Sequence, residues 1–161
     1  MNIKSSIFIL LSLTLSACGD KGDDTAGGDD TSGADDTSDT EDSSATTGIE
    51  IAGSWLDNYG SDYVITDTEW SSYGGTSVVH LSQYDNELNF TVGQNDAANT
   101  YNPGLYSRYD WTTDDSGQLW FCTTAYDAAT EEDALNATAP DASDPATGGC
   151  SSFPWSSLTP A

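Results

Sequence analysis

The sequence predicts a mainly β domain: a single antiparallel meander that forms a small barrel or sandwich, with one short helix and one disulfide. Residues 49–161 combine many aromatic side chains with β-branched ones, a composition that suits a pleated, half-buried sheet. Turn-forming residues recur between the apolar stretches, so successive strands are joined by short connections. This part of the chain is also long enough to bury a core of its own.

The first 17 residues have the layout of a bacterial signal peptide. Lys4 precedes an apolar run at residues 7–15, which is too short to span a bilayer, and Leu-Ser-Ala then leads into Cys18. This pattern resembles the lipobox of bacterial lipoproteins. The resemblance implies cleavage before Cys18 and its acylation, for example with palmitate. Gly19 lacks an acidic side chain, which favours the outer membrane for a lipoprotein.

Residues 18–48 consist almost entirely of Gly, Asp, Thr, Ser and Ala. Three near-repeats of six residues fill residues 22–39, and none has an apolar position around which a core could form. We therefore expect a lipidated cysteine followed by a disordered acidic tether. An ordered calcium site and O-glycosylation are the alternatives for this segment.

Alternation of apolar and polar residues indicates the strands, which are expected at residues 61–67, 77–84, 87–92, 105–112 and 118–126. The expected turns are residues 71–75, 85–86, 102–104 and 114–117. Val79 and Leu81 are expected to face the core from the second of these strands. Leu88, Phe90 and Val92 are expected to do so from the third.

One helix is expected in the C-terminal third. Thr130 can cap its N-terminus, and Glu131, Glu132 and Asp133 follow in the first turn, where the helix dipole favours carboxylates. Pro140 marks its end. An irregular acidic loop is the alternative.

The cysteines point to one disulfide. With Cys18 acylated, Cys122 and Cys150 remain, and an exported protein meets an oxidising environment. We expect these two to be bonded to each other. A metal site is the competing interpretation, but His80 is the chain's one histidine and zinc needs more partners than that. No metal and no cofactor are therefore expected.

Acidic side chains dominate the chain, with 27 Asp and Glu against 3 Lys and Arg. In residues 49–161 the one Lys or Arg is Arg108. A surface of this charge repels nucleic acid and anionic headgroups, so nucleic-acid binding is excluded. The expected contacts are the membrane, through the lipid anchor, and a glycan, a cationic protein or a small apolar ligand. The acidity itself is expected to serve solubility, and recognition of a partner through this charge is the alternative.

No catalytic residue is assigned. His80 lies within a predicted strand, where a structural role is expected; a hydrolase that uses His80 is the alternative, although no Gly-x-Ser-x-Gly motif accompanies it. Arg108 shares a strand face with Asp110 and is expected to pair with a carboxylate, or else to anchor an anionic ligand group. The tryptophans, Trp111 among them, offer flat faces on which a ligand can stack.

Residues 53–61 (GSWLDNYGS), followed by residues 63–66 (YVIT), resemble the opening strand of avidin-type barrels and, more loosely, the Gly-x-Trp start of lipocalins. The resemblance implies a calycin-like binder of a small ligand. Ser61 would match a ligand-contacting serine of that family, and Asp57 replaces a ligand-contacting asparagine. The candidate ligand-binding residues are Asp57, Ser61, Tyr63, Arg108 and Trp111.

Residues 106–111, 119–122, 141–145, 148–150 and 153–155 resemble a group of bacterial lipoproteins with tethered domains, a resemblance that implies no activity. The sequence as a whole therefore favours a non-catalytic cell-envelope lipoprotein that presents an acidic β domain as a binding or structural module. A calycin-like small-ligand binder is the first alternative, and a hydrolase is the second.

Overall fold

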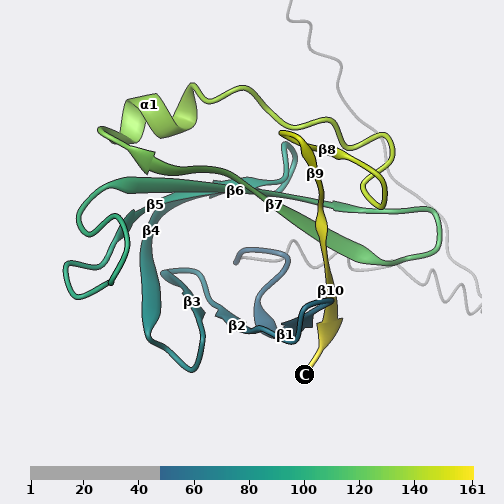
Figure 1. Cartoon of the computed structure of the whole chain (residues 1–161), viewed down its shortest axis with the longest axis horizontal. Helices are drawn as coiled ribbons and strands as arrows, with labels where there is room; N and C mark the ends of the chain where they lie inside the picture. The colour runs from purple at the N-terminus through teal and green to yellow at the C-terminus, as the bar shows by residue number, and fades with distance from the viewer. Residues whose placement is uncertain (1–47) are drawn as a thin grey trace, which may run out of the picture. The chain divides into compact units, whose positions relative to one another are not determined.

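The computed structural model describes residues 48–161, and Figure 1 shows how they are arranged. The expected signal peptide (residues 1–17), the lipidated Cys18 and nearly all of the expected tether lie outside the described residues. Within residues 48–161 there is no helix whose length and apolar character would let it cross a membrane.

Eight antiparallel strands close into a barrel. The strands β1 to β6 each pair with the next one along the chain, and β10 closes the barrel between β7 and β1. The barrel strands are β1 (Gly53–Asp57), β2 (Asp62–Ile65), β3 (Glu69–Ser72), β4 (Ser77–Asp85), β5 (Phe90–Asn95), β6 (Tyr106–Thr113), β7 (Leu119–Ala128) and β10 (Ser156–Pro160). The predicted antiparallel meander is confirmed, and of the two predicted forms the structure has the barrel.

Three of these strands lie outside the ranges expected from alternation. The resemblance of residues 53–61 is the one sequence signal for β1, and no signal indicates β3 or β10. Two residues of β3 fall in the expected turn at residues 71–75, which is shortened because the chain reverses at Tyr73 and Gly74, both with positive φ. A strand of four or five residues shows little alternation, so pairing on both edges decides its conformation.

The barrel interior is filled by one cluster of buried side chains. Its members are Ile49, Ile51, Tyr63, Ile65, Trp70, Val79, Trp111, Phe121 and Leu158. Residues 48–52 contribute to this core from outside the strands, since Ile49 and Ile51 are buried where β1 begins. The carboxylate of Asp67 accepts a hydrogen bond from the backbone N–H of Ile49 at 2.8 Å, which holds the segment in place. In Figure 1 the segment lies within the ring of strands. This end of the barrel is therefore closed.

Val79 and Leu81 face the interior as predicted, Val79 within the core cluster and Leu81 packed against it. They pair with Asn95 and Gly93, which therefore also face inward from β5. A side chain on Gly93 would collide with the backbone of β4, so this position requires glycine.

The prediction that Leu88, Phe90 and Val92 point into the core is wrong. Because side chains alternate along a strand, an inward Gly93 turns Val92 and Phe90 to the outer face of β5. Val92 is nevertheless fully buried, and Leu88 is 70% exposed. Apolar residues occupy the outer face here because the chain covers it with the helix α1.

The helix α1 (Glu131–Leu135) packs on the outer face of β5, β6 and β7. Thr130 caps it as predicted, its hydroxyl accepting a hydrogen bond from the backbone N–H of Asp133 at 3.1 Å. Ala134 is buried against the sheet. The helix ends at Leu135 with Asn136 as its C-cap, earlier than the predicted end at Pro140.

The predicted disulfide between Cys122 and Cys150 is present. It joins β7 to the short strand β8 (Gly149–Cys150), which pairs with β9 (Phe153–Pro154). This two-stranded hairpin lies outside the barrel sheet, beside β7 and β10 (Figure 1).

Candidate functional site

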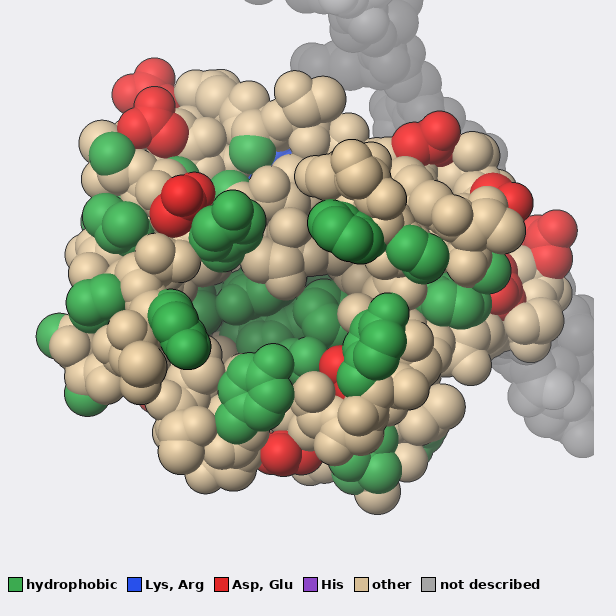
Figure 2. Space-filling view, in the orientation of Figure 1, with side chains coloured by type: hydrophobic (Ala, Val, Ile, Leu, Met, Phe, Trp, Pro, Cys, Tyr) green, Lys and Arg blue, Asp and Glu red, His purple; other side chains and the backbone are tan. Residues whose placement is uncertain are grey.

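A pocket of about 520 Å³ opens at the end of the barrel opposite residues 48–52. The strand β1 begins at the closed end with Gly53 and reaches the pocket with Asp57. Figure 2 shows the pocket as a hollow with hydrophobic side chains on its floor and around its mouth. It is lined by Asp57, Tyr59, Ser61, Tyr63, Trp70, Ser72, Tyr73, Ser77, Tyr109, Phe121, Cys122, Thr123, Cys150, Phe153, Pro154 and Ser156.

The strand register arranges these side chains in layers. Tyr63 of β2 pairs with Ser72 of β3, which pairs with Ser77 of β4. Two residues deeper along the same strands, Ile65 pairs with Trp70. Because alternate residues of a strand share a face, both layers point into the barrel. The pocket therefore has a polar mouth above an apolar floor.

Four aromatic rings form the floor. Trp70 and Tyr109 are stacked, with ring centroids 4.2 Å apart and an interplanar angle of 10°. Tyr63 meets Phe121 edge-on at 5.1 Å. Burial raises the pKa of Tyr109 to about 12, so its hydroxyl stays protonated at neutral pH. Rings packed in this way form a flat, rigid surface for a ligand.

The side chain of Trp70 contains a buried hydrogen-bond donor without a partner. Its side chain is 1% exposed. Its indole Nε1 is the buried side-chain polar atom that lacks a partner within residues 48–161. A buried donor without a partner lowers the stability of a fold by about 1–3 kcal/mol. Most buried polar groups in native structures have a partner.

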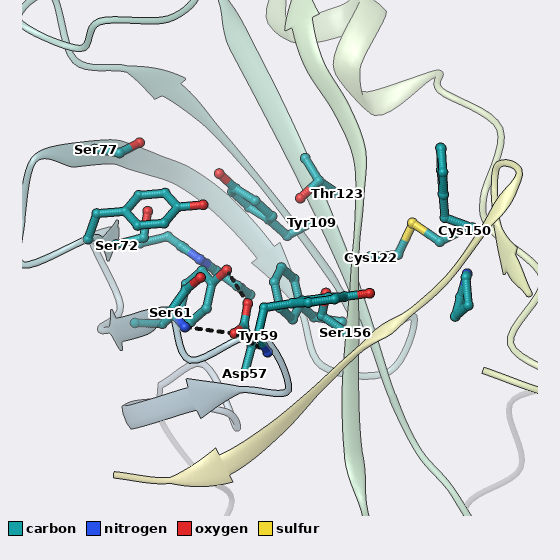
Figure 3. Close-up of a pocket in the computed structure, with 16 residues that line it drawn as sticks. Asp57, Tyr59, Ser61, Ser72, Ser77, Tyr109, Cys122, Thr123, Cys150 and Ser156 are labelled. Carbon is teal, nitrogen blue, oxygen red and sulfur yellow. Dashed lines mark hydrogen bonds between the residues drawn. A yellow bond between two sulfur atoms is a disulfide. The ribbon is translucent and has the colours of Figure 1, made fainter. Parts of the chain in front are cut away.

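The carboxylate of Asp57 organises one side of the mouth (Figure 3). Its Oδ1 accepts hydrogen bonds from the backbone N–H groups of Tyr59 and Ser61, both at 2.8 Å. Its Oδ2 accepts a hydrogen bond from the Tyr63 hydroxyl at 3.0 Å. Burial, and then the neighbouring Asp57 charge, raise the pKa of Tyr63, so this hydroxyl remains a donor at neutral pH. The turn after β1 thus holds the carboxylate in one orientation.

Hydroxyl groups occupy the rest of the polar layer. Ser72 and Ser77 come from adjacent strands, Thr123 from β7 and Ser156 from β10. Within the described part of the chain, no hydrogen bond engages the hydroxyls of Ser72, Ser77 or Ser156. Each of these hydroxyls has one donor and two acceptor positions to offer a bound molecule.

Exposed aromatic side chains surround the mouth. Tyr59 is 74% exposed, Tyr73 is 59% exposed and Phe153 is 72% exposed, although all three line the pocket. Phe153 belongs to the β8–β9 hairpin, which the disulfide between Cys122 and Cys150 fastens to the barrel. The hairpin therefore builds part of the rim.

The structure brings three of the five candidate ligand-binding residues together. Asp57, Ser61 and Tyr63 line the pocket side by side. Arg108 lies on the outer face of β6, and Trp111 lies in the core near the closed end, where its indole Nε1 donates to Glu50 at 2.5 Å. Neither lines this pocket.

His80 lies on the outer face of β4, away from the pocket. Its Nε2 is 2.7 Å from an oxygen of Asp96, and its Nδ1 is 3.4 Å from an oxygen of Glu69. A hydrogen bond from the backbone N–H of Ala98, together with the one shared with His80, lowers the pKa of Asp96. The imidazole ring is thus held between two carboxylates on the solvent side of the sheet.

The sequence does not single out Trp70, Ser72, Ser77, Thr123 or Ser156 as pocket residues. Serine and threonine are frequent throughout the chain, so their presence carries no signal. Which of them face inward depends on the register of β3 and β10, the two strands that the sequence does not indicate.

Comparison of the chain with protein-family models, with curated proteins and with solved structures gives no match. Among residues 48–161, no group of three or more His, Cys, Asp or Glu side chains is arranged to hold a metal ion. The barrel and its pocket are therefore the features that bear on the function of the protein.

Proposed function

We propose that residues 48–161 form a binding module that takes a small molecule into the open end of the barrel. The observation that carries this proposal is the pocket of about 520 Å³, with its polar mouth above an aromatic floor. Ligand pockets of proteins commonly measure about 300–1,000 Å³ and combine apolar walls with a few placed polar groups. In a small barrel without a ligand, side chains usually fill the whole interior. Here the core cluster fills only the part of the barrel below the pocket.

The layers of the pocket indicate the shape of the ligand. A flat apolar part fits the stacked rings of Trp70 and Tyr109. A polar part fits the hydroxyls of Ser72 and Ser77 near the mouth.

We also propose that a lipid on Cys18 holds this module at a membrane of the cell envelope. The order of charged, apolar and small residues before Cys18 supports this proposal.

Two neighbouring serines of β3 test the binding proposal. Ser72 faces the pocket, whereas Ser71 points away from it and donates to the carbonyl oxygen of Val64. The full chain is purified from cells, and bound small molecules are identified by mass spectrometry after denaturation. Ser72→Phe fills the pocket and should lose the bound molecule. Ser71→Phe adds the same ring outside the barrel and should retain it.

Two results would contradict the proposal. One is an equal yield of the bound molecule from Ser72→Phe and the unmodified chain, with thermal melting showing that both are folded. The other is a full chain that carries no small molecule and that no fraction of cell extract stabilises against heat.

A further inference from the structure

We infer that the pocket selects small organic cations, in which a flat group of the amidinium or guanidinium type carries N–H donors next to an apolar body. This inference rests on the proposed function, because it assigns a ligand class to the same pocket. It comes from the charge of the lining, the acceptor positions on Asp57 and the charge of the surrounding surface.

The lining holds one charged side chain, the carboxylate of Asp57, among its sixteen residues. No Lys, Arg or His lines the pocket. An anionic ligand would therefore meet like charge with no counter-ion, and a neutral ligand could donate a hydrogen bond to the carboxylate but would lack the attraction between opposite charges. A cation gains an attraction that strengthens as the pocket excludes water.

The hydrogen bonds of Asp57 define what it can take. A carboxylate offers about four acceptor positions on its two oxygens, and it has no donor when ionised. Two positions on Oδ1 are filled by the backbone N–H groups of Tyr59 and Ser61. One position on Oδ2 is filled by the Tyr63 hydroxyl. The remaining position is on Oδ2, and it accepts an N–H from a ligand but repels a ligand carbonyl oxygen.

The surface outside the pocket has the same sign. Residues 48–161 include 17 Asp and Glu side chains and a single Lys or Arg. That one residue, Arg108, is 7% exposed and paired with Asp110, so it does not offset the field at the surface. Such a field raises the local concentration of cations and speeds their association at low salt.

The aromatic rings at the mouth and floor suit a flat cation. Tyr59 and Tyr73 are largely exposed at the mouth, and Trp70 stacks on Tyr109 beneath them. The negative face of an aromatic ring attracts a cation placed within about 6 Å of its centre. A planar amidinium can pair with Asp57 at its edge while its faces contact these rings.

Three probes of one shape test the inference on the full chain purified in detergent. Benzamidine is cationic at neutral pH, benzamide is its neutral counterpart and benzoate is its anionic counterpart. Binding is measured by titration calorimetry and by tryptophan fluorescence. Benzamidine should bind about tenfold or more tightly than benzamide, since only the cation adds an attraction between opposite charges to its hydrogen bond with Asp57. Benzoate should bind more weakly than benzamide.

Asp57→Asn should reduce benzamidine affinity about tenfold and bring it close to that of benzamide. The asparagine carbonyl can still accept the two backbone N–H groups, and thermal melting checks that the variant is folded. The matched control is Asp115→Asn, which removes one exposed charge outside the pocket lining and should leave both affinities unchanged.

Three results would overturn the inference: benzamide binding as tightly as benzamidine, benzoate binding best, or none of the three binding. None of these three results contradicts the proposed function, provided that a small molecule co-purifies with the unmodified chain and is lost from the Ser72→Phe variant. If that molecule is found and is neutral or anionic, the pocket binds small molecules but does not select cations.

Discussion

Arg108 makes structural contacts on the outer face of the sheet. Its guanidinium donates twice to the carboxylate of Asp110, through Nε at 3.0 Å and a terminal nitrogen at 2.7 Å. The other terminal nitrogen donates to the carbonyl oxygens of Leu135 and Ala137, at the end of α1. The group also lies over the ring of Phe90, 4.6 Å from its centre. One buried side chain therefore joins β6, β5 and the helix.

Replacing Arg108 by Met should destabilise the domain without affecting the pocket. The substitution leaves Asp110 buried without its cation, and breaking a buried pair in this way costs about 3–5 kcal/mol. Urea denaturation measures the loss, and benzamidine titration of the folded variant should match the unmodified chain.

A second substitution serves as the control for Arg108→Met. Adding Asp110→Asn removes the uncompensated charge and should restore part of the stability. A folded Arg108→Met variant that no longer bound benzamidine would contradict this prediction. It would show that Arg108 contributes to binding in the pocket as well as to the contacts between β5, β6 and α1.

Asp57 and Ser61 are the clearest case of site residues that the sequence indicates. They lie in one short turn, so their separation along the chain limits how far apart they can be, and Tyr63 follows two residues later. Trp111 comes from a distant strand, and nothing local shows which end of the barrel it reaches. The structure places it with Glu50 near the closed end.

Among the elements, the β8–β9 hairpin depends most on its covalent link. It has two residues in each strand and pairs only with itself. The bond between Cys122 and Cys150 fastens the hairpin to β7. Trp155 directly follows the hairpin, and its backbone N–H donates to the carbonyl oxygen of Pro145. The hairpin carries Phe153 and Pro154 to the rim of the pocket.

Removing the disulfide should affect both stability and binding. The bond closes a loop with a sequence separation of 28, for which chain entropy predicts a contribution of about 3–4 kcal/mol. The double variant Cys122→Ser, Cys150→Ser should unfold at correspondingly lower urea concentration. Its ligand should also dissociate faster, because Phe153 is no longer held at the mouth.

Reduction provides the control for the disulfide variant. A thiol reductant should reproduce both effects in the unmodified chain and change nothing in the double variant. Unaltered dissociation after reduction would show that the hairpin is not part of the binding rim.

The helix α1 could be predicted from neighbouring residues in the sequence, whereas the strands β3 and β10 could not. Thr130 and the acidic first turn of α1 are neighbours in the sequence, and the interactions that cap a helix are local, so the helix is predicted correctly. β3 and β10 are stabilised by partners far along the chain, β10 pairing with β1 across about one hundred residues. No short window contains that information.

Across the whole molecule, the two ends of the barrel are different. Residues 48–52 close one end, and the hydroxyls, aromatic rings and Asp57 shape the other.

Replacing Cys18 by Ser tests the proposed anchor. The variant should carry no acyl label after growth with labelled palmitate, and it should move from the membrane fraction to the soluble fraction. Cys150→Ser is the matched control, since it removes a cysteine of the β8–β9 hairpin and should leave the label in place. Acyl label on the Cys18→Ser chain would refute the proposal.

The amino-acid sequence was sufficient for those properties that depend on composition or on neighbouring residues. They are the antiparallel β architecture, the short helix, the Cys122–Cys150 pair and the acidic character. The barrel closure, the outward turn of Val92 and the layered pocket required the fold. Strand register is set by contacts between distant segments, and a shift of one residue reverses which side chains face inward. For this reason a chain rich in serine and tyrosine does not reveal which of them meet around one cavity.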